Sequence, residues 1–471
     1  MGGAVLINSG NSSNTPINEE EPSGLETNFG TTTPNLKKKY LIQYIILYAY
    51  LACIFISTFL YDIFIPTLLF HYVEHKFPDL TPQEKSSKSS YYKSYSDGFP
   101  FLVMFLFGPL VGYISDRYGR KSNFYLSVLT VMFVIMSCFV SMETNNIYCF
   151  YVFHTIGGLY NVSNSVVFSF IYDISDEKDI PVLFTLCGLS MGLGTTIGSL
   201  IYAFVPTDKV PYMMLYISSG FALVSLILVP FLIETIHISR ENNKNKTFVK
   251  KSFENPNPFS TIKSLFTNNG FISWTILLFF SIQYTGQDIW STFYYYSYLM
   301  YNWNQKTIGL FTLGVGGATI LYSVLIVPLF LKVLSEKKVI TIGFFITFCA
   351  HVMLSSSKFS QYLFIFGAIV SSIVPCVSNL LCSVISKSTP QEVQGSVLTG
   401  LQSVKALGSF AGAMVANNLL SHFSSDESSI YFPQAIYFLN GVVLFIIMII
   451  SILVWRFYKN KIKNNVNNNN N

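Results

Sequence analysis

Residues 112–124 read GYISDRYGRKSNF, a short charged stretch between two long apolar ones. The stretch contains two glycines, one acid and three basic residues: Gly112, Asp116, Arg117, Gly119, Arg120 and Lys121. Glycine lets two helices and a tight turn approach closely. An acid is favoured near the free amides of a helix start, and arginine can pair with a carboxylate through two hydrogen bonds. The spacing therefore predicts a structured turn between two helices.

The composition around this turn excludes a soluble protein. Of the 471 residues, 51% are hydrophobic and only 11% are charged, against roughly 25% charged in soluble proteins. The formal charge of +5 comes from basic residues spread over short loops, so we expect no nucleic-acid partner. All seven cysteines fall in apolar runs, which excludes a disulfide scaffold and a zinc module. We expect no metal and no cofactor.

Twelve apolar stretches are long enough, or nearly so, for the roughly 20 residues that a membrane-spanning helix needs. They are continuous runs and not alternating segments, which excludes a β-barrel. The sequence therefore predicts an all-α polytopic membrane protein. The stretches lie near residues 40–66, 97–115, 123–142, 147–172, 182–204, 212–233, 271–300, 308–331, 339–357, 361–386, 395–420 and 431–457.

The distribution of positive charge predicts the orientation. With twelve spans, most of the 29 Lys and Arg lie in the two tails and in alternate loops on one side. Because positively charged loops stay in the cytoplasm, both termini are expected there. Neither tail carries a sorting signal, so the sequence leaves open whether the membrane is the plasma membrane or an endolysosomal one.

The spans divide six and six around the longest basic segment, which is a recurring plan among secondary transporters. We expect five parts: a disordered cytoplasmic tail (1–39), a first six-helix bundle (40–233), a cytoplasmic linker (234–270), a second six-helix bundle (271–457) and an Asn-rich cytoplasmic tail (458–471).

The charged turn resembles, at every defining position, the loop signature G-x-x-x-D-[RK]-x-G-R-[RK] of the major facilitator superfamily. The resemblance extends from about residue 45 to 455. The segments 107–122, 165–177 and 385–410 look like the branch that includes tetracycline-resistance efflux proteins and animal hippocampus-abundant-transcript-like proteins. The equivalent loop of the second half, FLKVLSEKKVI at 330–340, is degenerate.

The resemblance implies the major facilitator fold and a conformational latch in the turn. Asp116 would face the start of span eleven, and Arg120 or Arg117 would pair with Asp173. The alternative is that the turn only anchors orientation. Two departures weaken drug:proton antiport as a specific function: His154 stands where many members carry an arginine, and no proline follows Gly198 in span five.

Ionisable and amide side chains within the spans are candidates for a substrate or proton site, because such groups are costly in hydrocarbon. Three have a stated alternative role: Asp62 as an interfacial residue, His154 as a hydrogen-bonded structural residue, and Lys405 as a structural ion-pair partner. We assign His351 to packing. The full candidate set is Asp62, His154, Asn161, Gln283, Gln287, Asp288, Asn379 and Lys405.

Together these features predict a secondary transporter of a small polar or organic solute that works by alternating access, with protons as a candidate coupling ion. An enzyme is not expected, because the sequence lacks the G-x-x-x-x-G-K-[ST], H-E-x-x-H and G-x-S-x-G motifs in a suitable context. The expected partners are a small-molecule substrate and the lipid bilayer, and the expected state is a monomer. The alternative is a transporter-like sensor or trafficking partner that carries nothing.

Overall fold

The computed structural model describes residues 40–175, 180–205, 212–235, 270–387, 394–426 and 428–469. The expected tail at 1–39 lies wholly outside these residues, as does most of the expected linker. The first helices are α1 (Leu41–Lys76), α2 (Pro82–Tyr118), α3 (Arg120–Thr144), α4 (Ile147–Ile174), α5 (Ile180–Phe204) and α6 (Met213–Leu228), which continues as the 3₁₀ turn η2 (Val229–Phe231). The later helices are α9 (Gly270–Thr285), α10 (Asp288–Tyr301), α11 (Gln305–Leu321), the π-helical turn η4 (Tyr322–Ile326), α12 (Val327–Val333), α13 (Glu336–Ser355), α14 (Gln361–Ser371), α15 (Val374–Lys387), α16 (Gln394–Ser424) and α17 (Ala435–Asn469).

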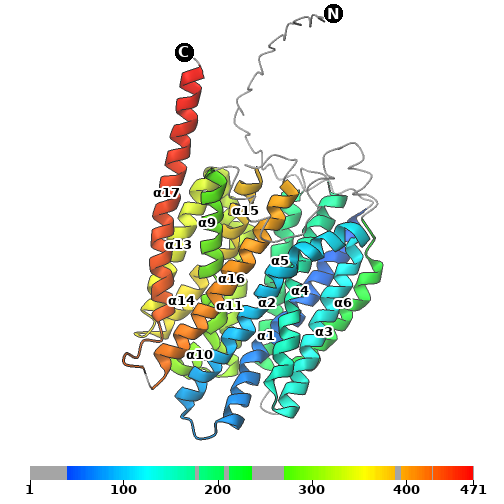
Figure 1. Ribbon diagram of the computed structural model, residues 1–471, viewed down its shortest axis with the longest axis vertical. Helices are drawn as coiled ribbons and strands as arrows, with labels where there is room; N and C mark the ends of the chain where they lie inside the picture. Colours follow the sequence, from blue (N-terminus) through cyan, green and yellow to red (C-terminus); the bar gives the residue numbers. More distant parts are fainter. Residues whose placement is uncertain are drawn as a thin grey trace, which may run out of the picture. The chain divides into compact units, whose positions relative to one another are not determined.

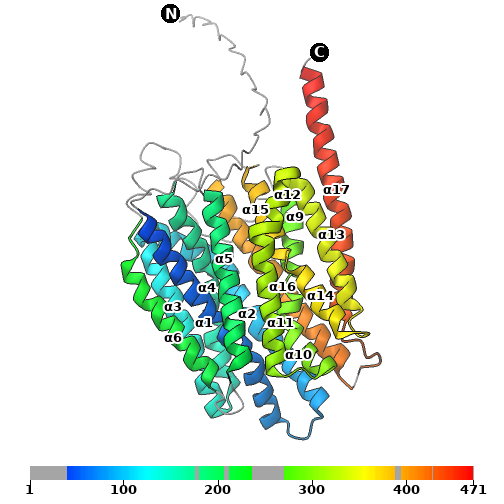
Figure 2. The ribbon, with the colours of Figure 1, turned by 180° about the vertical axis from the view of Figure 1, so that it is seen from behind.

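Within the described residues these helices form twelve membrane-length segments, because α9 with α10, α11 with η4 and α12, and α14 with α15 each follow one another directly. Eight segments are long and apolar enough to cross a membrane by themselves. The other four are α2, α4, α16 and the α9–α10 pair. Two of these, α2 and α16, pack against each other (Figures 1 and 2).

Helices from the two halves of the chain meet along two seams. In both views α2 lies beside α16, and α5 packs against α11 (Figures 1 and 2). On the other side of each half, α3 and α6 lie at one edge of the bundle, and α13 and α17 lie at the other. We call the end of the bundle at Tyr118–Lys121 the motif end, and the end at the turn between α1 and α2 the far end.

Helix α2 is much longer than the expected span at 97–115, since it begins at Pro82. Thr81 caps its start: the Thr81 hydroxyl accepts a hydrogen bond from the Glu84 amide (3.2 Å), and the Glu84 carboxylate accepts one from the Thr81 amide (2.9 Å). This reciprocal cap satisfies two otherwise free helix amides. Residues 82–96 were expected in a loop because they are polar, and that expectation is wrong, because their polar side chains pack against α16 and not lipid.

Candidate functional site

The charged turn joins α2 to α3 through Gly119, whose φ of 122° suits glycine. A Cβ at this position would also collide with the carboxylate of Glu234. That carboxylate accepts hydrogen bonds from the amides of Arg120 (2.8 Å) and Lys121 (3.1 Å). Glu234 therefore caps the N-terminus of α3, where free amides favour negative charge. The glycine and the acid form one tightly packed unit.

Behind the turn, Arg120 reaches into the first half of the chain. Its Nε donates to Asp173 Oδ2 at the end of α4 (3.4 Å), and the pair is largely buried. Thr235 donates to the same carboxylate oxygen (2.7 Å), and Ser115 accepts from Arg120 Nη1 (3.1 Å). The pairing expected between Arg120 and Asp173 is thus present. Gly112 and the side chains of Asp116 and Arg117 lie outside what the structure describes.

Glu234 and Thr235 were missed by sequence reasoning, which placed them at the start of a polar linker. Their signal in the sequence is weak, since a Glu-Thr pair after an apolar span looks like any helix exit. In the structure these two residues bind both the α3 amides and Asp173. The turn, the end of α4 and the exit from α6 are therefore tied together at the motif end.

Removing the charge of Glu234 should weaken this unit. Glu234→Gln keeps the shape but loses the charged cap on Arg120 and Lys121, so we expect a loss of about 1 kcal/mol in stability. Thermal unfolding of the purified protein in detergent measures the effect. The exposed Glu74 near the far end of α1 provides the matched control, Glu74→Gln. Equal unfolding midpoints for the two variants would show that Glu234 does not stabilise the turn.

A second group of charged residues lies in the first half of the chain, towards the far end. Lys93 and Asp97, one turn apart on α2, form an ion pair with Nζ 2.6 and 2.5 Å from the two carboxylate oxygens. Asp62 of α1 interacts electrostatically with both of them. His154 of α4 is buried, with its ring stacked on Phe150 at 4.9 Å between centroids. The structure therefore brings the candidates Asp62 and His154 towards one ion pair, since His154 also interacts with Asp97 and Lys93.

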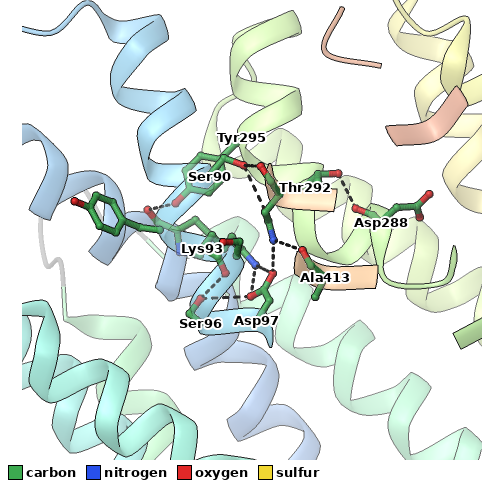
Figure 3. A network of polar contacts seen from close by, with 12 residues as sticks. Ser90, Lys93, Ser96, Asp97, Asp288, Thr292, Tyr295 and Ala413 are labelled. Atoms are coloured by element: carbon green, nitrogen blue, oxygen red, sulfur yellow. Dashed lines mark hydrogen bonds and ion pairs between the residues drawn. The ribbon is translucent and has the colours of Figure 1, made fainter. Parts of the chain in front are cut away.

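This ion pair connects the two halves of the chain. Asn417 of α16 donates to Asp97 Oδ2 (3.1 Å), and its carbonyl accepts from Ser90 (3.1 Å). Figure 3 shows Ser90, Lys93 and Asp97 on α2 facing Ala413 on α16. Sequence reasoning missed Lys93 and Asp97 because it placed Lys93 in a loop. Their spacing of four residues was the available signal, since oppositely charged residues at that spacing share a helix face.

Further hydrogen bonds between the halves gather at the far end. Ser87 donates to the Ser421 carbonyl (2.6 Å), and Gln83 donates to the Ser424 carbonyl (3.0 Å), so α2 and α16 are joined turn after turn. Tyr295 of α10 donates to the Pro66 carbonyl of α1 (3.2 Å).

The α5–α11 seam carries similar contacts. Gln305 of α11 donates to the carbonyls of Tyr202 (2.6 Å) and Val205 (2.7 Å) at the end of α5. We call the following contacts between the halves the far-end seal: Pro66–Tyr295, Gln83–Ser424, Ser87–Ser421, Ser90–Asn417, Asp97–Asn417, and Gln305 with Tyr202 and Val205.

The second half contains a deeply buried polar cluster around Asp288, which is 1% exposed at the start of α10. His351 Nε2 of α13 lies 2.8 Å from Asp288 Oδ2, and Asn440 of α17 donates to the same oxygen (2.7 Å). The expectation that His351 serves only in packing is wrong. It arose because helix rotation is not visible in the sequence, and α13 turns His351 inwards.

The hydrogen bonds fix the proton count of this pair. His351 Nδ1 lies 2.8 Å from the Thr347 carbonyl, which can only accept, so Nδ1 carries a hydrogen. The contact between Nε2 and the carboxylate then needs one more proton, on either the imidazole or the acid. The pair is therefore neutral overall and holds one transferable proton in the interior of the second half.

The remaining candidates separate into two sets. Gln283 donates to Ser378 of α15, and Gln287 donates to Ser409 of α16 (3.1 Å), so both amides tie the break between α9 and α10 to its neighbours. Lys405 is partly exposed on α16 and has Cys382 of α15 as its electrostatic neighbour. Asn379 is exposed on α15, and the side chain of Asn161 lies outside the described residues. The structure therefore does not collect the predicted residues into one site.

No group of three or more His, Cys, Asp or Glu within the described parts of the chain is arranged to hold a metal ion. All seven cysteines are free thiols. What the arrangement offers chemically is buried charge, one shared proton, and polar contacts between two sets of helices.

A family model of the Major Facilitator Superfamily matches residues 47–413. The chain belongs to this superfamily. Its helices have the major facilitator fold, and it is an integral, multi-pass membrane protein of a family of solute transporters. The resemblance read from the charged turn is confirmed.

Relatives in the superfamily carry the names that the sequence suggested. The chain is 22% identical over 353 residues to the class H tetracycline resistance protein of Pasteurella multocida. The matched region covers 74% of this chain and 82% of that protein. It is 23% identical over 310 residues to the mouse hippocampus abundant transcript 1 protein, covering 65% of this chain and 61% of that one.

Solved structures of the superfamily share the fold. The human organic anion transporter MFSD10 (TETRAN) superposes with a TM-score of 0.64 at 16% identity, over 87% of this chain and 98% of that one. The inward open conformation of the xylose transporter XylE from E. coli superposes with a TM-score of 0.61 at 16% identity, over 88% of this chain and 95% of that one.

Proposed function

We propose that the protein is a secondary active transporter that moves a small polar or organic solute by alternating access. Residues 40–233 and 271–457 act as the two bundles, and both termini lie in the cytoplasm. A carrier of this kind needs contacts between its halves that close one side of the membrane and can be broken. The observation that carries the proposal is the far-end seal, whose hydrogen bonds join the two halves at the far end of the bundle.

In this proposal the far-end seal closes the outer side, so the structure represents a state in which the solute site communicates with the cytoplasm. The charged turn acts in the opposite state. There Asp116 faces the start of α16 and helps to close the cytoplasmic side, while Arg120, Asp173 and Glu234 hold the turn rigid. Each state then has its own set of contacts, and their free energies set the balance between the two states.

Protons are the coupling ion that this proposal favours. The neutral Asp288–His351 pair already holds one transferable proton, and it adjoins the break between α9 and α10. Breaks in spanning helices are places where transporters bind ions and substrates. Movement at this break would change the surroundings of the pair and so its tendency to keep the proton.

Purified protein in proteoliposomes tests the function. The vesicles are loaded with unlabelled amino acids, sugars, nucleosides and organic anions, and the entry of isotope-labelled forms of each is measured by mass spectrometry. We expect at least one solute to exchange faster than in protein-free vesicles. We also expect a protonophore to abolish its accumulation but not its exchange. Exchange of no solute above the protein-free rate would favour the alternative of a sensor or trafficking partner.

A further inference from the structure

Asp62 is an exposed carboxylate in the middle of a buried helix. Its neighbours Leu60, Tyr61, Ile63 and Phe64 are all buried, while Asp62 itself is exposed. Helix α1 packs against all five of the other helices in the first half, so this exposure does not come from a bare lipid-facing side. The exposed side chain therefore opens onto a space inside the protein.

The direction of this space follows from the packing of α1. Ser57 of α1 donates to the Ser218 carbonyl of α6 (2.9 Å), and α6 lies at the edge of the bundle (Figures 1 and 2). Five residues later on a helix, a side chain has turned by about 140° away from that contact. Asp62 thus points away from the contact with α6. Its electrostatic neighbours Lys93 and Asp97 belong to α2, the helix of the first half that packs on α16 of the second half.

Lys93, the basic neighbour of Asp62, pairs with a different acid. The ammonium of Lys93 lies against both carboxylate oxygens of Asp97, which in turn accepts from Asn417. Of the two acids on this wall of the first half, Asp97 pairs with Lys93 and Asp62 does not. Within the described residues, Asp62 has no hydrogen-bond donor of its own.

Lys405 is the corresponding charge in the second half. One side of α16 packs on α2 through Asn417 and Ser421, and another packs on α9 at Gly408 and Gly412. Lys405 lies between these sides and is partly exposed. No carboxylate of the described residues lies within ion-pair distance of it, and its electrostatic neighbour is the thiol of Cys382. An ammonium at this depth without a carboxylate is costly unless a ligand supplies one.

Helix register places the two charges at the same depth. The rings of Tyr72 on α1 and Tyr92 on α2 are in contact, with centroids 5.6 Å apart, and Ser90 on α2 contacts Asn417 on α16. Asp62 lies about 15 Å from Tyr72 towards the motif end, and Lys405 lies about 18 Å from Asn417 in the same direction. Ser90 lies about 3 Å nearer the far end than Tyr92, and this offset equals the difference between the two distances. Asp62 and Lys405 therefore lie at the same level.

From this juxtaposition we propose that the transported solute is zwitterionic, with its cationic group bound at Asp62 and its anionic group at Lys405. The inference rests on the proposed transport function and names its substrate class. One ligand of this kind supplies a counter-charge to both halves at once. It therefore stabilises the approach of the halves around it, which neither a lone cation nor a lone anion would do.

Thermal stabilisation of the full-length protein tests the substrate class, with three matched sets of probes. The sets are the common α-amino acids, their amides, which are cations, and their N-acetyl derivatives, which are anions. We expect stabilisation by at least one amino acid, with its amide and its N-acetyl derivative binding at least tenfold more weakly. Exchange of the same compounds in proteoliposomes shows whether a bound compound is also transported.

Two variants separate the roles of the charges. Asp62→Asn should reduce the preference for the amino acid over its N-acetyl derivative to less than twofold, and Lys405→Gln should do the same for the preference over the amide. Lys306→Gln, at the start of α11 near the far end, is the control that should leave both preferences unchanged. A purely structural role for either residue would lower affinity for all three forms alike.

Three results would overturn the proposal: no stabilisation by any amino acid, equal or tighter binding of a singly charged form, or preferences that survive in either variant. Exchange of a sugar or a singly charged solute, together with any of these results, would reject the zwitterion and leave transport standing. Absence of all exchange would instead reject the proposed function itself.

Discussion

Replacing Asp288 with Asn should destabilise the protein by about 3–5 kcal/mol, the cost of breaking one partner of a buried charged pair. Asp288 Oδ2 accepts from Asn440 and shares one proton with His351 Nε2, and its Oδ1 accepts from the Ile289 amide (2.6 Å). Asparagine replaces one of the two carboxylate oxygens with an NH2 group, which can donate but cannot accept. That NH2 group would face a neighbouring group that also donates. The free energy of unfolding in detergent, with urea as denaturant, measures the loss.

The matched comparison removes both charges. In Asp288→Leu with His351→Leu, no unpaired charge stays buried, so the double variant should be less destabilised than the sum of the two single variants by at least 1 kcal/mol. Strict additivity would mean that the two side chains do not interact. Wild-type stability in Asp288→Asn would mean that the carboxylate at this position is not needed by His351 or Asn440.

The fold could be predicted from the sequence because each of its signals is local. Apolar runs of about 20 residues predict spans wherever they occur, and the turn at 112–121 has its glycines and charges in one continuous stretch. The resemblance implied that Arg120 or Arg117 would pair with Asp173, and the pair with Arg120 is present.

The candidate site was less predictable because it depends on helix rotation. His351 lies in an apolar span that could face lipid or protein, and only the packing of α13 turns it onto Asp288. Lys93 and Asp97 lie in a serine-rich segment that hydropathy assigns to a loop. This segment is helical because α16 offers carbonyls and Asn417 in place of lipid, which is a tertiary effect that no local pattern contains.

A disulfide across the far-end seal should stop transport completely. The hydroxyls of Ser87 on α2 and Ser421 on α16 lie 3.3 Å apart, so cysteines at both positions are close enough to be oxidised to a disulfide. If the halves must separate at this end in every cycle, the oxidised Ser87→Cys/Ser421→Cys variant is held in one state. Exchange should fall to the rate of protein-free vesicles and recover when the disulfide is reduced.

The matched control places the same bond inside one bundle. The hydroxyls of Ser57 on α1 and Ser218 on α6 lie 3.1 Å apart, and both helices belong to the first half of the chain. Oxidised Ser57→Cys/Ser218→Cys should therefore exchange solute as the reduced protein does. Disulfide formation in the seal variant is verified with a protease site inserted between residues 236 and 269, because the cleaved halves stay together on a gel until they are reduced.

Solute exchange by these two oxidised variants is the most direct test of alternating access. Our account predicts exchange that is lost reversibly in Ser87→Cys/Ser421→Cys and retained in Ser57→Cys/Ser218→Cys. Undiminished exchange through a fully cross-linked far-end seal would contradict it.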